Sequence, residues 1–126
     1  MAVPGDRKYL KSHEWHKLDG GVVTIGITQH AADELTDVTY VDLPKVGAKV
    51  TGGKPFGVIE SVKATSDLIS GVDGEVTAIN SDLNDHPDLV NQDPFERGWM
   101  VRVRPSSPSQ ADALMTADAY EKQLGH

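Results

Sequence analysis

The chain has 126 residues, the size of one domain, and 38% of them are hydrophobic, which is enough for a modest core. The absence of cysteine excludes disulfides and zinc-thiolate clusters, and a formal charge of -7 argues against nucleic-acid binding. No run of about 18 apolar residues exists to span a membrane, and residues 1–6 lack the charged start and apolar stretch of a signal peptide. We therefore expect a soluble protein whose partners are other proteins.

The first part of the chain predicts a hairpin followed by a short helix. Gly20 and Gly21 are a hairpin signal, and β-branched residues fill the strand predicted at 22–27. Thr28 is placed to cap a helix over 29–35, because its hydroxyl can accept a hydrogen bond from an unpaired amide of the first turn. Strand composition returns at 38–43.

The second part predicts further short strands at 56–61 and 75–79. The sequence at 99–104 ends in alternating apolar and basic residues, as a strand with one solvated face requires. Between these strands, residues 80–98 hold two prolines and many Asp and Asn residues, so this segment is predicted to be a surface loop with at most one helical turn.

The end of the chain predicts short helices. Ser109 and Asp112 have a spacing similar to a capping box, and the apolar face would be formed by Leu114, Met115, Tyr120 and Leu124. Many short strands separated by Gly and Pro turns favour a small sandwich or barrel. We expect a single domain over 1–126, with a core at about 7–104 and a helical segment at about 109–124.

A single lysine stands out locally. In the segment 57–67 an apolar strand runs into Lys63 and then into small polar residues, which places this lysine at or near a turn. The simplest alternative is an unmodified solvated lysine, because exposed lysines are the default.

The segment Glu-Ser-Val-Lys-Ala at 60–64 resembles the lipoyl-lysine motif of the glycine cleavage system H protein family. The similarity covers roughly residues 7–124. Other family blocks are matched in order and spacing at 12–15, 24–28, 40–44, 74–76, 89–94 and 98–100.

Two turn positions depart from the family pattern. Thr36 stands where the family usually has glycine, and Gly71 stands where it usually has proline. Glycine in place of proline widens the unfolded ensemble and costs several tenths to about 1 kcal/mol. Local rigidity is affected, but no reactive group is lost.

The resemblance implies a mainly β barrel-sandwich hybrid of the lipoyl/biotinyl-carrier type, with short peripheral and C-terminal helices. It also implies a non-catalytic carrier with lipoate in amide linkage on Lys63. The carrier would take an aminomethyl group from glycine decarboxylase (P protein) to the aminomethyltransferase (T protein). It would then take the reduced dithiol to dihydrolipoamide dehydrogenase (L protein).

Residues around the lysine have further predicted roles. A lipoylating enzyme would read the flanking residues Glu60, Ser61, Val62 and Ala64, although strand residues could equally serve packing and solubility. Because the loaded amine is cationic, we hypothesise that Ser12, Glu14 and Asp67 form a cleft that shields it. The alternative is that these three are ordinary surface residues.

Other carriers and binding modules are alternatives to this interpretation. A biotin carrier usually flanks its lysine with methionines, whereas Val62 and Ala64 stand here. A lipoyl domain of a 2-oxoacid dehydrogenase complex would normally continue through a linker into further domains. An interaction module without cofactor remains an alternative.

An enzyme or metalloprotein finds no support in the spacing of residues. His13 and His16 would lie on opposite faces of a strand, and His30, His86 and His126 fall in unrelated segments. Neither a metal site nor a catalytic residue is therefore predicted. Without an arginine-rich transit segment we expect a bacterial cytoplasmic protein, or a mitochondrial matrix protein if such a segment has been removed.

Overall fold

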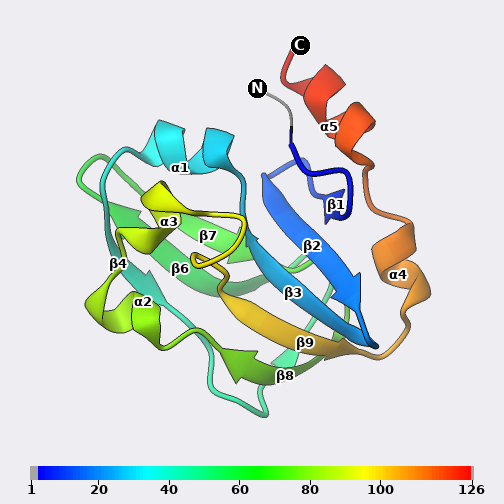
Figure 1. Ribbon diagram of the computed structural model, residues 1–126. Coiled ribbons are helices and arrows are strands. Elements are labelled where there is room, and N and C mark those ends of the chain that lie inside the picture. Colours follow the sequence, from blue (N-terminus) through cyan, green and yellow to red (C-terminus); the bar gives the residue numbers. More distant parts are fainter. Residues whose placement is uncertain (1–2, 126) are drawn as a thin grey trace.

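The computed structural model describes residues 3–125, which form two antiparallel sheets with short helices at their edges (Figure 1). The larger sheet has the strand order β1-β2-β3-β9-β8-β5, with bounds Lys8–Tyr9, Glu14–Asp19, Val22–Ile27, Val101–Pro105, Gly74–Ile79 and Lys49–Val50. The smaller sheet has the order β4-β6-β7, with bounds Val38–Asp42, Pro55–Ser61 and Thr65–Ile69. The predicted mainly β fold is confirmed.

The helices are short and lie outside the sheets. Their bounds are Gln29–Leu35 (α1), Asp82–Asp85 (α2), Leu89–Gln92 (α3), Ser109–Asp112 (α4) and Ala117–Gln123 (α5). The predicted cap of α1 is confirmed, because the Thr28 hydroxyl accepts from the Ala31 amide at 3.3 Å. Within residues 3–125, no helix is long and apolar enough to cross a membrane.

The main core lies between the two sheets. The larger sheet contributes Ile25 of β3 and Val103 of β9 to this core, and the smaller sheet contributes Val41, Ile59 and Leu68. Each of these side chains is at most 2% exposed. Alternation along each strand turns these side chains inward. Burial of each such side chain stabilises the fold by about 1.5–3 kcal/mol.

A second cluster attaches the C-terminal helix to the start of the chain. Tyr9, Trp15 and Tyr120 are buried together, and the rings of Tyr9 and Tyr120 stack with centroids 4.9 Å apart. The amide of Tyr9 donates to the carbonyl of Met115 at 2.9 Å, and the reverse bond measures 3.0 Å. Residues far apart in the sequence thus fix α5 beside β1 and β2.

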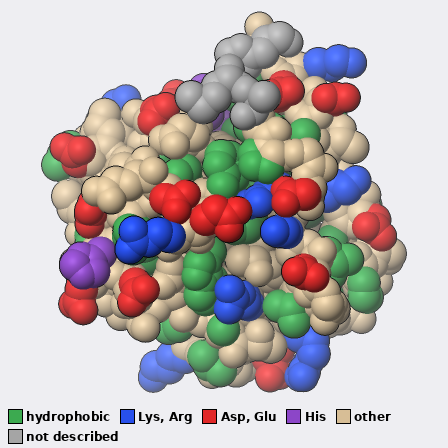
Figure 2. Space-filling view, in the orientation of Figure 1, with side chains coloured by type: hydrophobic (Ala, Val, Ile, Leu, Met, Phe, Trp, Pro, Cys, Tyr) green, Lys and Arg blue, Asp and Glu red, His purple; other side chains and the backbone are tan. Residues whose placement is uncertain are grey.

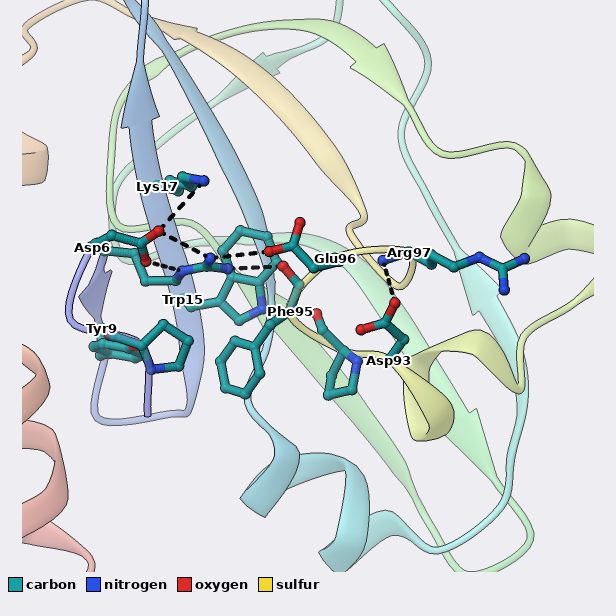
Figure 3. Close-up of polar contacts among 11 residues, drawn as sticks. Asp6, Tyr9, Trp15, Lys17, Asp93, Phe95, Glu96 and Arg97 are labelled. Atoms are coloured by element: carbon teal, nitrogen blue, oxygen red, sulfur yellow. Dashed lines mark hydrogen bonds and ion pairs between the residues drawn. The ribbon is translucent and has the colours of Figure 1, made fainter. Parts of the chain in front are cut away.

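Arg7 connects the N-terminal segment to the loop before β9, and its partners Asp6, Trp15 and Phe95 are labelled in Figure 3. Its side chain is only 3% exposed and pairs with Asp6 at 2.8 Å. Nη1 donates to the Phe95 carbonyl at 2.9 Å, and the guanidinium lies 4.7 Å from the centre of the Trp15 ring. A buried charge is tolerated here because its donors are satisfied and an aromatic face covers it.

Two sequence predictions about loops and caps are wrong. Residues 80–98 form α2 and α3 rather than a surface loop with one turn, and Leu83, Leu89 and Val90 are buried in the main core. The helix α4 lacks the predicted cap at Ser109, because Pro108 occupies the N-cap position and makes no side-chain cap hydrogen bond. The apolar residues among the polar ones explain why the first segment packs inward.

Candidate functional site

The β6–β7 hairpin presents Lys63 at its tip, beside α1 (Figure 1). The Ser61 amide donates to the Ala64 carbonyl at 2.8 Å, which closes the turn. The Ser61 hydroxyl oxygen also accepts from the amides of Lys63 and Ala64, at 3.2 and 3.0 Å. A serine before the lysine therefore shapes a compact turn whose backbone is held by hydrogen bonds, and the lysine itself is exposed.

The end of α1 supports this turn from one side. The Val62 amide donates to the Asp37 carbonyl at 3.1 Å, and the Lys63 ammonium donates to the Glu34 carbonyl at 3.0 Å. The last carbonyls of a helix lack partners within the helix, so they are natural acceptors for a cation. Among residues 3–125, no carboxylate forms an ion pair with Lys63.

A cleft of about 140 Å³ opens between the hairpin, α1 and the turn before β2. Ile27, Leu35, Ile59 and Leu68 form its apolar part, and Ile59 and Leu68 come from the two strands of the hairpin itself. Glu34, whose carbonyl contacts Lys63, also lines the cleft. A flexible group attached to Lys63 would therefore have an apolar surface within its own neighbourhood.

All three predicted docking residues line this cleft, but their environments differ. Ser12 and Asp67 are exposed, whereas Glu14 is buried with 1% exposure. Glu14 accepts from the Ser12 hydroxyl at 2.5 Å and from the Ile69 amide at 2.8 Å. Burial raises the pKa of the Glu14 carboxyl, although these hydrogen bonds partly oppose the change. Glu14 is thus an acidic group held inside the cleft rather than an ordinary surface residue.

His13 lies at the cleft edge in a conformation that the sequence does not predict. Its φ is 83°, in the left-handed region. Its Nδ1 lies 2.6 Å from the Tyr120 hydroxyl, which in turn lies 2.8 Å from the Thr28 hydroxyl. Burial and the neighbouring His30 lower the pKa of His13. The ring centroids of His13 and His30 are 4.9 Å apart, so two histidines from separate segments of the sequence lie side by side. His126 lies outside the described residues.

A larger hollow of about 380 Å³ lies on the outer face of the six-stranded sheet. It is lined by Trp15, Phe95 and Trp99 with charged side chains around them, and none of its residues belongs to the hairpin. Figure 2 shows acidic and basic side chains interspersed over one face of the molecule. The smaller cleft is the candidate site because Glu34, which lines it, contacts Lys63.

Comparisons with known proteins agree with this geometry. The family model described as "Glycine cleavage H-protein" matches residues 7–126. The chain belongs to the glycine cleavage H-protein family. A glycine cleavage system H protein of Myxococcus xanthus is 53% identical over 122 residues, which cover 97% of this chain and 95% of that protein. A mitochondrial one of Flaveria pringlei is 53% identical, over 91% of this chain and 71% of that protein.

The fold comparison supports the same family. The crystal structure of a glycine cleavage system H protein from Mycobacterium marinum has a TM-score of 0.91 and 37% identity, and covers 98% of this chain and 100% of that chain. The family resemblance inferred from the sequence is confirmed. The H protein of this family is the lipoyl carrier of the glycine cleavage system.

The two departures from the family pattern have structural counterparts. Thr36 ends α1 with φ 61° and ψ -143°, a conformation that favours glycine. The Gly71 amide donates to His16 Nε2 at 2.9 Å, a bond that proline could not make because it has no amide hydrogen. His16 is buried, and burial lowers its pKa to about 4.

Proposed function

We propose that this chain carries lipoate in amide linkage on Lys63. The observation that carries the proposal is an exposed lysine at the tip of a hydrogen-bonded hairpin, within the family's lipoyl motif and beside a partly apolar cleft. A fixed root with a mobile arm suits a carrier, because the arm stays at high effective concentration near partner sites. After acylation the Lys63 nitrogen keeps one hydrogen, which could still bond the Glu34 carbonyl.

The apolar and acidic parts of the cleft fit such an arm. Ile59 and Leu68 offer a surface to its hydrocarbon chain, and Glu14 and Asp67 offer negative charge to a cationic amine at its end. Ser12 orients the Glu14 carboxylate through its hydrogen bond. The proposed docking site therefore consists of Ser12, Glu14 and Asp67 above an apolar floor.

The function that follows is transport within the glycine cleavage system. Bound lipoate supplies a dithiolane that accepts an aminomethyl group and is reduced. The chain would carry the aminomethyl group from glycine decarboxylase to the aminomethyltransferase, and the reduced dithiol to dihydrolipoamide dehydrogenase. The chain itself would be a non-catalytic carrier. Relatives occur in bacteria and in plant mitochondria, and the bacterial cytoplasm is the proposed compartment, with the mitochondrial matrix as the alternative.

The lipoylating enzyme would recognise the exposed residues around the lysine. Val62 is 69% exposed, unusually high for a large apolar side chain, and Glu60 and Ala64 are exposed as well. Ser61 would act differently, by shaping the turn through its hydroxyl. Glu60→Gln should then slow lipoylation without changing the turn. Ser61→Ala should slow lipoylation and also speed the hydrogen exchange of the Ala64 amide. Equal lipoylation rates in the parent and both variants would contradict recognition through these residues.

The central experiment is lipoylation of the purified chain. Incubation with lipoate, ATP and a lipoate ligase should add one lipoyl group, seen by intact mass and assigned to Lys63 by peptide mapping. The variant Lys63→Arg should remain unmodified. Lys54→Arg is the matched control, because Lys54 is also an exposed turn lysine and its loss should change nothing. No modification of the parent chain, or equal modification of Lys63→Arg, would overturn the proposal.

The docking proposal has its own test. Glu14→Gln and Asp67→Asn should each expose the loaded amine to water and raise the hydrolysis rate of the aminomethyl group in the lipoylated protein. Asp19→Asn serves as the control, because Asp19 is exposed and does not line the cleft. Unchanged hydrolysis in both cleft variants would refute the docking role while leaving the attachment site intact.

A further inference from the structure

Two histidines and a glutamate meet at the rim of the cleft. His13 lies in the turn before β2, while His30 and Glu34 lie one helical turn apart on α1. His30 Nε2 is 2.9 Å from Glu34 Oε1, and the ring centroids of His13 and His30 are 4.9 Å apart. One ligand atom from each of the three residues can be chosen so that all lie within 4.8 Å of one another.

We propose that His13, His30 and Glu34 form a binding site for a divalent transition metal ion of the zinc class. Two imidazoles and one carboxylate are a ligand set that zinc accepts, with a fourth position left for water or another ligand. Imidazole ligands also favour zinc-class ions over magnesium and calcium, which prefer oxygen.

The spacing of the ligand atoms suits such an ion after small movements. Zinc bonds of about 2.0–2.2 Å at tetrahedral angles require ligand atoms roughly 3.3–3.5 Å apart. The side chains of His30 and Glu34 are 39% and 62% exposed, so they are free to rotate toward His13. The ion would lie between the side chains of His30 and Glu34 and take the place of their direct contact.

The third ligand is already oriented by buried partners. The Tyr120 hydroxyl contacts His13 Nδ1, and Tyr120 has 0% exposure. With Nδ1 protonated and donating to Tyr120, the hydroxyl of Tyr120 donates to Thr28, and Nε2 is the nitrogen left for a metal. Histidines that bind metals commonly donate their other ring nitrogen to a buried acceptor in this way.

A simple surface ion pair accounts for less of this arrangement. An i,i+4 contact between His30 and Glu34 explains those two residues, and such exposed pairs contribute little. It does not explain why His13, from a separate turn, brings a third ligand atom close to the other two. A bound ion would link the turn before β2 to α1 at the cleft rim, because His13 and Glu34 both line the cleft. This inference does not depend on the proposed lipoyl function.

Calorimetric titration of the full, untagged chain with zinc chloride tests the site. The chain would carry Lys63→Arg, so that no lipoyl sulfur can bind the metal. We expect one ion per chain, and at least about tenfold weaker binding in both His30→Ala and Glu34→Gln. His86→Ala is the matched control, because His86 is exposed and distant in the sequence from the three ligands, and it should bind as the parent does.

Two further readouts separate metal binding from a folding defect. Tyr120→Phe should weaken zinc binding by about 10–100-fold, since it removes only the hydroxyl that orients His13. Zinc should raise the melting temperature of the parent but not that of His30→Ala, whose metal-free melting curve verifies its fold. Magnesium chloride should give no heat. Zinc binding that is absent from the parent, or equally strong in His30→Ala and the parent, would overturn the proposal.

Discussion

Replacement of Thr36 by glycine should stabilise the protein. The residue has φ 61° and ψ -143° at the end of α1, a region in which a side chain costs about 1–3 kcal/mol. Glycine removes the cost but loses about 0.5–1 kcal/mol through the greater freedom of the unfolded chain. The hydroxyl bond to the Leu35 carbonyl is exposed and contributes little. The net gain in the free energy of unfolding is about 1 kcal/mol, or roughly 3–6 °C in melting temperature.

Thermal and urea unfolding followed by circular dichroism would measure this gain. The backbone bonds at this position, from the Thr36 amide to Asp33 and from Asn91 to the Thr36 carbonyl, survive in the glycine variant. Thr36→Ala is the matched control, because it removes the hydroxyl but keeps Cβ and its strain. If Thr36→Gly were no more stable than Thr36→Ala, the strain argument would be refuted.

Two further predictions concern the buried environment of β2 and β3. His16 has a folded pKa of about 4 and an ordinary value of 6.5, so between these values the unfolded chain binds a proton that the folded chain does not. Stability should therefore fall as the pH drops from 6.5 to 4, by up to about 3 kcal/mol. In His16→Gln the urea midpoint should depend less on pH than it does in the parent. A Cβ at Gly26 would lie 2.6 Å from the buried Trp15 ring, so Gly26→Ala should cost about 3 kcal/mol in urea unfolding. Gly5→Ala, with open space around it, should cost almost nothing, and equal losses would contradict the packing argument.

The comparison of parent and His16→Gln is needed because Glu14 titrates with the opposite sign. Its folded pKa is raised by burial, so folded Glu14 keeps a proton that the unfolded chain has already lost. That contribution falls as the pH rises through the raised pKa. Both proteins share it, and it cancels in the difference between their midpoints. A pH slope that is unchanged in His16→Gln would show that His16 is not the titrating group.

The sequence predicts those helices and strands that depend on residues close to one another in the chain. The β-branched run at 22–27 and the Thr28 cap of α1 are confirmed, because both depend on neighbours a few residues away. The sequence does not predict strand β7, at Thr65–Ile69, since only Leu68 among its residues is buried. The burial of segment 80–98 cannot be predicted from its composition, because the polar residues outnumber the three apolar residues that tertiary packing buries.

In the candidate site, too, the sequence predicts local features but not contacts between distant segments. The motif around Lys63 can be recognised in the sequence, because it consists of consecutive residues. The burial of Glu14 and the meeting of His13 with His30 depend on contacts between segments that no local pattern reveals. The left-handed backbone of His13 was also hidden, because histidine carries no conformational signal comparable to glycine.

The Glu14 carboxylate joins the two layers of the molecule. It belongs to β2 of the larger sheet and accepts from the Ile69 amide of β7 in the smaller one. The cleft therefore opens along the seam between the sheets, and any group seated in it touches both. Separation of the sheets would become rarer with the cleft filled, because a group bound there stabilises the closed state. Hydrogen–deuterium exchange at the β7 amides would then distinguish loaded from empty molecules, even though no atom of that backbone takes part in the transfer.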